Sequence, residues 1–295
     1  MTIDIMLPFW GDPTLLRRTV ESVRAQTDGD WRLTVIDDAY PDPAVAEAFA
    51  RLDDPRIRYR RHDENVGIIE NFRESVRLAE ADHLVVLGSD DLLLPGYVAA
   101  VRAAIARHPD AAVVQPGVQV IDENGAPSLP LVDRVKQRML RPDTRAGDVE
   151  LSGERLATSL VRGNWLYWPS LVFRTDAIRA HDFRDDLPIV LDLAIVLDIV
   201  FAGGSLVVID DEVFAYRRHT ESASQKAILD GSRFRDDRRF FLETARRADE
   251  RGWTTTARAA RARVFARLHA LTTVPTVMRR GDAEGRRALW AHILR

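Results

Sequence analysis

The stretch Ile3-Asp4-Ile5-Met6-Leu7-Pro8-Phe9 is a short apolar run, and a helical pattern follows it at residues 13–25. A second short run with strand character lies at residues 32–36. Runs of this kind that alternate with helical patterns are typical of βαβ units, in which helices cover parallel strands. Residues 3–36 therefore predict an α/β fold with a mainly parallel, Rossmann-type central sheet flanked by helices.

The same alternation continues along the chain. Further helices are predicted at residues 44–52, 68–79, 97–106 and 190–201, with another that begins at Ser152. Further strands are predicted at residues 57–60, 84–87, 112–120, 171–174, 205–209 and 213–217. Residues 122–153 contain Gly, Pro and mixed charge and predict loops. From about residue 230 the pattern is helical, with breaks expected at Gly252, Pro275 and Gly281.

These patterns divide the chain into a sheet-containing domain at residues 1–225 and a helical C-terminal appendage at residues 226–295. Within the first domain, we expect two halves, at residues 1–120 and 121–225.

The composition limits the chemistry. The chain has 295 residues and no cysteine, which excludes disulfides, thiolate metal sites and a cysteine nucleophile. Any metal must therefore bind oxygen or imidazole. The N-terminus resembles no signal peptide, and no run approaches the roughly 20 apolar residues of a spanning helix. We therefore expect a cytoplasmic protein.

The net charge of −3 is unevenly distributed. Residues 230–295 hold 16 Arg against 8 Asp and Glu, which gives +8 for this region and −11 for the rest. A solvated arginine-rich face is the commoner explanation of such a region, but contact with the inner face of a membrane stays open. Nucleic-acid binding is not expected, and a homodimer stays open.

Polar clusters follow the first four predicted strands. They are Pro8-Phe9-Trp10, Asp37-Asp38, Asn65-Val66-Gly67 and Gly88-Ser89-Asp90-Asp91. In open parallel sheets, ligands bind at the carboxyl ends of the strands. Two Asp pairs at one sheet edge would repel each other unless a cation compensated them, which indicates a divalent metal and a phosphate-bearing ligand. The alternative for a lone Asp-Asp pair is a turn with a helix cap.

The order and spacing of four motifs resemble the family 2 glycosyltransferases over residues 2–225. They are Val35-Ile36-Asp37-Asp38, Asn65-Val66-Gly67-Ile68-Ile69-Glu70-Asn71, Leu87-Gly88-Ser89-Asp90-Asp91 and Tyr216-Arg217-Arg218-His219. The resemblance implies a GT-A fold and inverting transfer from a nucleoside-diphosphate sugar, with UDP or dTDP favoured. It also implies Mn²⁺ or Mg²⁺. Residues 1–120 would then bind the nucleotide sugar, and residues 121–225 the acceptor.

The resemblance also implies residue roles. The nucleotide-sugar pocket would be formed by Pro8, Asp37, Asp38, Asn65, Gly67, Asn71, Ser89, Asp90 and Arg217. The metal would be held by Asp90, Asp91 and His219. The chain departs from the family pattern where Glu70 replaces Arg, Gly88 replaces Asp and Leu191 replaces Glu.

Inverting transfer requires a base that removes the proton of the acceptor hydroxyl. Asp192 lies where the family usually has this base. Asp198 is a rival on another face of the same predicted helix, and Asp185-Asp186 are a second alternative that a loop or helix cap explains more simply. Trp168 is a candidate for stacking on the acceptor sugar, and core packing explains it equally well.

Two other functions compete with glycosyl transfer. A sugar nucleotidyltransferase would need a Gly-rich basic loop after the first strand, and residues 8–12 supply none. A non-catalytic sugar- or nucleotide-binding scaffold would explain Gly88, Glu70 and Leu191. The sequence identifies neither the sugar nor the acceptor, which could be a carbohydrate, a lipid-linked sugar or a small molecule.

Overall fold

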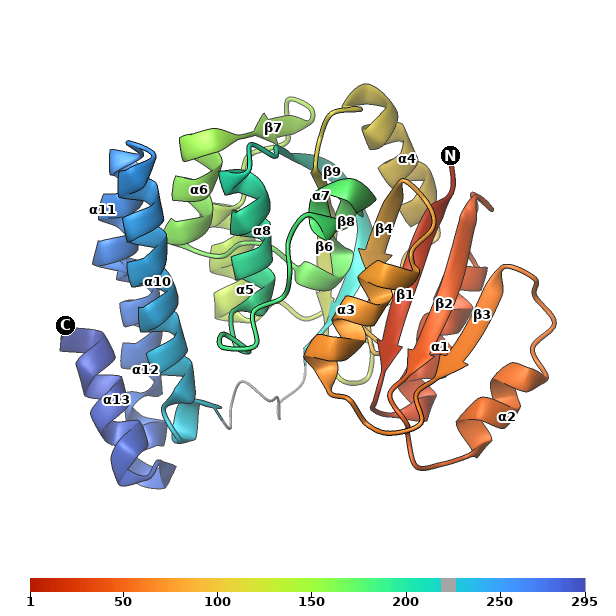
Figure 1. The fold of residues 1–295 in the computed structure, drawn as a ribbon, viewed down its shortest axis with the longest axis horizontal. Coiled ribbons are helices and arrows are strands. Elements are labelled where there is room, and N and C mark those ends of the chain that lie inside the picture. The colour runs from red at the N-terminus through yellow and green to blue at the C-terminus, as the bar shows by residue number, and fades with distance from the viewer. Residues whose placement is uncertain (219–226, 295) are drawn as a thin grey trace.

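The computed structural model describes residues 1–218 and 227–294 (Figure 1). His219, one of the three predicted metal ligands, lies outside the described residues.

One sheet of nine strands forms the centre of the described structure. The strands are β1 (Ile3–Phe9), β2 (Trp31–Asp37), β3 (Ile57–Arg61), β4 (His83–Val86), β5 (Leu92–Leu93), β6 (Val113–Ile121), β7 (Val149–Leu151), β8 (Val172–Arg174) and β9 (Leu206–Arg217). Their order is β3-β2-β1-β4-β8-β6-β9-β5, and β7 pairs with β9. The pairs among β3, β2, β1 and β4 are parallel, whereas β8 is antiparallel to both of its neighbours. The strand β9 is parallel to β6, and β5 and β7 are antiparallel to β9. The predicted α/β fold with a central sheet is thus confirmed, and the sheet is parallel from β3 to β4 and mixed beyond.

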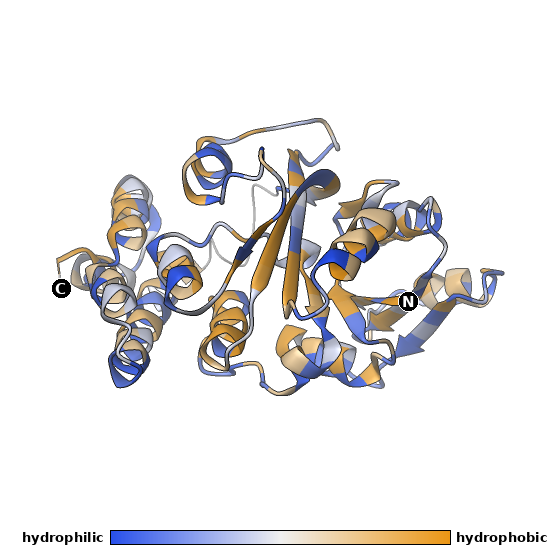
Figure 2. Cartoon of the chain, turned by 90° about the horizontal axis from the view of Figure 1, so that it is seen from above, coloured by the Kyte–Doolittle hydropathy of each residue, from blue (hydrophilic) through white to orange (hydrophobic). Residues whose placement is uncertain are grey.

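Helices cover both faces of this sheet (Figures 1 and 2). In the domain that contains the sheet they are α1 (Pro13–Arg24), α2 (Ala44–Ala50), α3 (Ile68–Leu78), α4 (Tyr97–Arg107), α5 (Leu131–Val135), α6 (Gly153–Arg162), α7 (Thr175–Arg179) and α8 (Leu191–Phe201). The helices at the C-terminus are α10 (Ser232–Glu250), α11 (Thr254–Ala262), α12 (Val264–Arg280) and α13 (Ala283–Leu294). None of the described helices is both long and apolar enough to cross a membrane.

The strand β1 shows how the sequence builds two cores. All seven of its residues are buried. Met6 packs into the cluster that includes residues of α6 and α8, whereas Ile5 and Leu7 pack into the cluster that includes residues of α1 and α4. Because successive side chains of a strand point to opposite faces, a strand covered on both faces is mostly apolar, and the one charged residue of β1, Asp4, is paired with Arg32.

The predicted strands at residues 205–209 and 213–217 are one strand, β9. The prediction separated them because Asp210-Asp211-Glu212 is polar. These residues form an irregularity in the pairing of β9 with β6, where the register shifts around Gly117. A Cβ atom at Gly117 would lie 2.7 Å from the carbonyl oxygen of Asp210, so only glycine permits this close approach.

Residues 122–153 contain more regular structure than the predicted loops. Helix α5 continues into a π-helical turn at Lys136–Leu140, and β7 pairs with the first half of β9. These elements are short, and no clear periodicity marks them in the sequence.

The C-terminal helices lie at one end of the molecule (Figure 1). Breaks occur at Gly252 and Gly281 as predicted, but the break predicted at Pro275 is wrong because α12 runs through it. The unpredicted break is at Arg263, which has a left-handed conformation with φ 48°. Helices α10 and α11 contribute residues to the same core as α6 and α8. The boundary at residues 225 and 226 stays a prediction.

Candidate active site

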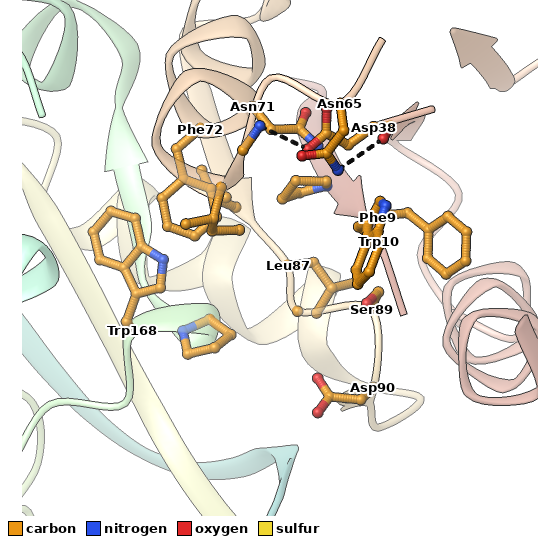
Figure 3. A pocket seen from close by; sticks show the side chains of 16 residues that line it. Phe9, Trp10, Asp38, Asn65, Asn71, Phe72, Leu87, Ser89, Asp90 and Trp168 are labelled. Carbon is orange, nitrogen blue, oxygen red and sulfur yellow. Dashed lines mark hydrogen bonds between the residues drawn. The ribbon is translucent and has the colours of Figure 1, made fainter. Parts of the chain in front are cut away.

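A pocket of about 400 Å³ lies at the carboxyl ends of β1, β2 and β4 (Figure 3). Its walls are formed by Pro8, Phe9, Trp10, Asp38, Asn65, Gly67, Ile68, Asn71, Phe72, Val86, Leu87, Gly88, Ser89, Asp90, Trp168 and Pro169. The predicted site residues Pro8, Asp38, Asn65, Gly67, Asn71, Ser89, Asp90 and Trp168 are therefore brought together. Figure 3 shows Asp38, Asn65 and Asn71 on one side of this pocket and Ser89 and Asp90 on another.

Asp38 holds the loop before α3 in place. Its two carboxylate oxygens accept the backbone N–H groups of Val66 and Gly67, at 2.7 and 2.9 Å. Asn65 donates to the Asp38 carbonyl at 3.1 Å. Gly67 has φ 85°, a conformation that favours glycine and that turns the chain into α3. The loop around residues 65–67 is thus fixed on the end of β2.

Asn71 is buried in the pocket wall, with an exposed fraction of 2%. Its Nδ2 atom donates to the Ile36 carbonyl at 3.2 Å, which ties α3 to β2. Within the described residues, its Oδ1 atom has no hydrogen-bond partner. An unpaired buried acceptor is costly, so this atom is suited to receive an N–H or O–H group of a ligand.

Asp37 does not line the pocket, although it precedes Asp38. Its side chain is fully buried and accepts hydrogen bonds from the backbone N–H of Tyr40, the Tyr59 hydroxyl and Arg61. Asp37 therefore organises the end of β2 from within the protein.

Asp90 and Asp91 converge on Gly88. A Cβ atom at position 88 would lie 3.1 Å from Asp90 Oδ1 and 2.5 Å from Asp91 Oδ2. Asp90 lines the pocket, whereas Asp91 is buried and accepts the Arg217 backbone N–H at 2.8 Å. Burial, together with the charge of Asp90, raises the pKa of Asp91 well above its usual range. The missing side chain at position 88 thus makes room for the Asp91 carboxylate.

The guanidinium of Arg217 does not line the pocket. It donates to the backbone carbonyls of Asp90, Asp122 and Glu123, at 2.8, 3.0 and 3.0 Å. The side chain is 3% exposed. Arg217 therefore fixes the backbone around Asp90 instead of facing a ligand in this structure.

The carboxylate oxygens of Asp90 and Asp91 around Gly88 fit a cation that a bound ligand also coordinates. No group of three or more His, Asp or Glu side chains within residues 1–218 and 227–294 is arranged to hold a metal. Mg²⁺ and Mn²⁺ commonly bind one or two protein carboxylates, while phosphate oxygens and water complete the coordination shell. A bound cation would also favour the ionised form of Asp91, which burial opposes.

The pocket lies where open parallel sheets bind nucleotides. The family model for glycosyl transferase family 2 matches residues 4–153, which are 150 of the 295 residues. The chain belongs to glycosyl transferase family 2.

Two curated proteins share sequence with this family 2 chain. It is 32% identical over 126 residues to the uncharacterised protein y4gI of Sinorhizobium fredii, a match to 42% of this chain and 14% of that protein. It is 28% identical over 94 residues to the putative colanic acid biosynthesis glycosyl transferase WcaA of Escherichia coli, a match to 32% of this chain and 34% of that protein. The chain thus spans about a third or less of the length of these relatives.

Two solved structures share the GT-A fold. S. aureus TarS 1–349 in complex with UDP-GlcNAc has 13% sequence identity and a TM-score of 0.63, over 83% of this chain and 66% of that one. The mannosyltransferase PcManGT from Pyrobaculum calidifontis, in complex with GDP-Man and Mn²⁺, has 14% identity and a TM-score of 0.64, over 98% and 78%. The predicted GT-A-like fold is confirmed.

Asp192 differs from its rivals in its surroundings. It is half-buried at the start of α8, and burial raises its pKa, whereas the positive charges of Lys136 and Arg233 act in the opposite direction. Asp198 instead forms an ion pair with Arg247 of α10. Asp192 is not among the residues that line the pocket.

The second pair of rivals is engaged in ion pairs. Asp185 accepts two hydrogen bonds from Arg73, both at 2.9 Å. Asp186 pairs with Arg184 and Arg239. Both carboxylates therefore have structural partners.

A charged cluster beside Asp192 was not predicted. Arg218 makes two hydrogen bonds to Asp133, both at 2.9 Å, and the Tyr167 hydroxyl donates to the same carboxylate. The Lys136 ammonium lies 4.9 Å from the centre of the Tyr167 ring. Lys136 is one of only two lysines in the chain. Its rarity was the one signal in the sequence that could have drawn attention to this cluster.

Aromatic side chains form the remaining walls. Trp168 lies 5.9 Å from the Phe72 ring and 5.2 Å from the Phe173 ring, measured between ring centres, so it belongs to both the core and the pocket. Trp10 lies across the pocket from Trp168 and is 60% exposed (Figure 3). Phe72 was not predicted, because its helical spacing resembles that of a core residue.

Glu70, which replaces the family's Arg, pairs with Arg77 at 2.6 Å and with Arg73 at 3.5 Å. The local charge is therefore compensated along α3. Leu191, which replaces the family's Glu, is a buried core residue at the start of α8.

Proposed function

We propose that the chain is an inverting glycosyltransferase that moves a sugar from a nucleoside-diphosphate sugar to an acceptor hydroxyl. The observation that supports it most is the single pocket shared by Asp38, Asn65, Asn71 and Asp90. These side chains supply acceptors and donors for a base and ribose on one side and carboxylates for a cation and diphosphate on the other.

The donor is proposed from the pocket and from the structural relatives. TarS was solved with UDP-GlcNAc and PcManGT with GDP-Man, so both relatives bind nucleotide sugars. The sequence motifs favour a UDP or dTDP donor for this chain. The acceptor would be a carbohydrate, a lipid-linked sugar or a small molecule.

In the proposed reaction, Asp192 is the general base. It accepts the proton of the acceptor hydroxyl while the hydroxyl oxygen bonds to the anomeric carbon. The bond between that carbon and the diphosphate oxygen breaks, and the nucleoside diphosphate leaves with its electron pair. A pKa raised by burial makes a carboxylate a stronger base near neutral pH.

Asp90 and Asp91 would hold the divalent cation, with His219 as a third proposed ligand. Bound Mn²⁺ or Mg²⁺ would neutralise charge on the leaving diphosphate. Arg217 is proposed to act by fixing the backbone of Asp90, in view of its contacts to three carbonyls.

The binding step is tested by thermal unfolding of the full chain with UDP, dTDP and GDP, with and without Mn²⁺. A ligand that binds only the native state raises the midpoint. The proposal expects at least one nucleotide to do so more strongly with Mn²⁺, and expects Asp90→Asn to remove the Mn²⁺ effect. If no nucleotide raises the midpoint, the proposal is wrong.

The competing scaffold function predicts a different result. A non-catalytic member would bind a nucleotide sugar and release no product, and Gly88 and Leu191 are the residues that favour it. A nucleotidyltransferase would instead form a nucleotide sugar from a sugar phosphate and a nucleoside triphosphate.

We also propose that α12 contacts the inner face of an anionic membrane. Its exposed apolar residues Val264, Leu268, Leu271 and Met278 are spaced by four, three and seven positions, which places them on one side of the helix. The surrounding region has a net charge of +8. An apolar stripe on a basic helix is suited to an anionic lipid surface.

Binding to phosphatidylglycerol vesicles tests this contact. Leu268→Ser should weaken it, and Leu131→Ser, which changes an exposed leucine outside the stripe, should not. A homodimer through the same stripe would instead appear as a doubled mass in light scattering that Leu268→Ser halves.

A further inference from the structure

Four arginines of the C-terminal helices have buried guanidinium nitrogens without hydrogen-bond partners in the described part of the chain. Arg263 is 1% exposed, and its Nε and Nη1 atoms both lack a partner there. The buried Nε atoms of Arg233, Arg238 and Arg267 also lack one. Buried charged groups without partners are costly, and native proteins rarely retain them.

The charges of Arg267 and Arg238 act on Arg263. Burial lowers the pKa of Arg263, and the nearby charges of Arg267 and Arg238 lower it further. The opposing carboxylate is Asp237, whose own pKa burial raises to about 6. This carboxylate therefore compensates the arginines only in part.

Neighbouring arginines on α10 show the usual arrangement. Arg235 pairs with Glu284 at 3.0 Å, and Arg239 pairs with Asp186 at 2.7 Å. These two arginines, which lie nearer the surface, are thus compensated by carboxylates. Among the arginines with unpartnered nitrogens, Arg263 is buried and Arg238 and Arg267 are half-buried.

A cavity of about 380 Å³ lies between α10 and α13. It is lined by Phe234, Arg235, Arg238, Arg239, Leu242, Ala288 and Ala291. Arg238 lines this cavity and is one of the four arginines with buried unpartnered nitrogens, so a ligand in the cavity would lie next to the incompletely compensated charge. Guanidinium groups bind phosphate oxygens in a fork geometry, and the apolar residues suit a hydrocarbon portion.

We propose that this cavity is a second ligand site, in which Arg238 binds a phosphate group, free or carried on a larger molecule. The site shares no residue with the pocket at the carboxyl ends of the strands. It is therefore independent of the proposed glycosyl transfer.

The test measures thermal unfolding of the full chain in inorganic phosphate and in sodium chloride of equal ionic strength. Wild type should unfold at a higher temperature in phosphate. Arg238→Gln should lose this difference and bind phosphate at least tenfold more weakly. The matched control is Arg258→Gln, which removes the same charge from α11 outside the cavity and should keep the difference.

Two further measurements distinguish a ligand-binding role of Arg238 from a purely structural one. Without phosphate, Arg238→Gln should be at least as stable as wild type, because it removes an incompletely compensated charge, whereas loss of a purely structural arginine would lower the midpoint. Asp38→Asn changes the first pocket and should keep the phosphate effect. The same phosphate effect in wild type and Arg238→Gln, or none in wild type, would overturn the proposal.

Vesicles identify the source of the phosphate group. If Arg238→Gln weakens binding to phosphatidylglycerol vesicles relative to Arg258→Gln, the ligand is a lipid headgroup. If both variants bind vesicles equally and only Arg238→Gln loses the phosphate effect, the ligand is a water-soluble phosphate ester.

Discussion

The carboxylate of Asp91 occupies the space that a side chain at Gly88 would need. A Cβ atom at position 88 would come within 2.5 Å of Asp91 Oδ2, closer than real structures allow. The carboxylates of Asp90 and Asp91 can take these positions because position 88 has glycine in place of the family's Asp.

Gly88→Ala should therefore move Asp91 and weaken cation-dependent nucleotide binding. Strain of this kind usually costs about 1–3 kcal/mol of the free energy of unfolding. Gly11→Ala is the control, because its added Cβ would only meet Ser89 Oγ at 3.9 Å. Equal unfolding midpoints for the two variants would contradict the described packing.

Asp37 and Asp38 should separate stability from nucleotide binding. Asp38→Asn would direct an NH₂ group toward a backbone N–H of Val66 or Gly67, so we expect a looser loop and weaker nucleotide binding. Asp37→Asn disturbs a fully buried acceptor, so we expect about 1–3 kcal/mol lower stability with nucleotide affinity retained. Calorimetric titration with the nucleotide that binds best checks this, and equal affinity losses would contradict it.

The difference between these neighbours shows what the sequence could and could not predict. The apolar runs predicted the parallel strands. The positions of the four clusters after the strands predicted that these clusters would lie around one pocket. Successive residues of a strand point in opposite directions, however, and the motif does not say which Asp faces the ligand. That choice depends on Tyr59 and Arg61 of β3, which meet Asp37 only in the folded sheet.

Partners distant in the sequence account for the remaining differences. Arg217 was predicted to help form the nucleotide-sugar pocket, but its side chain contacts backbone carbonyls 94 to 127 positions away in the chain. The strand β9 was predicted as two strands because Asp210-Asp211-Glu212 is polar, whereas these residues form a register shift opposite Gly117 that leaves no local pattern in the sequence. Pro275 was predicted to end a helix, yet it lies on the exposed side of α12, where water can satisfy the carbonyl that loses its partner.

Asp192→Asn should lower kcat by about 10²- to 10⁴-fold, the usual range for a general base, without weakening nucleotide binding. Asp198→Asn should retain kcat and lower stability, because Asp198 is paired with Arg247. Steady-state kinetics with the best donor check both. Equal kcat for Asp192→Asn and wild type would exclude Asp192 as the base.

The pH dependence of kcat should report the same carboxylate. Because burial raises the pKa of Asp192, the rate should rise with pH on an acid limb above the ordinary range of an Asp. The positive charge of Lys136 lowers that pKa, so Lys136→Met should shift the limb to higher pH. A limb that stays in place would show that Lys136 does not act on the base.

Asp237 should make stability fall as pH rises. Burial raises its pKa from 3.8 to about 6, so the folded state favours the neutral acid. The resulting stabilisation is present below about pH 4 and is lost as pH rises through about 6, by up to about 3 kcal/mol. Denaturant unfolding should show Asp237→Asn gaining stability relative to wild type across this interval. Asp249→Asn, at an exposed ion pair with Arg261, should show no such gain.

The central claim is tested most directly by the release of nucleoside diphosphate from UDP-, dTDP- and GDP-sugars. The measurement compares wild type with Asp192→Asn, with and without Mn²⁺. We predict that wild type releases the nucleoside diphosphate from at least one donor in the presence of Mn²⁺, and that Asp192→Asn binds this donor but releases far less. Nucleotide binding without release from any donor, in wild type as in the variant, would contradict glycosyl transfer and favour a scaffold.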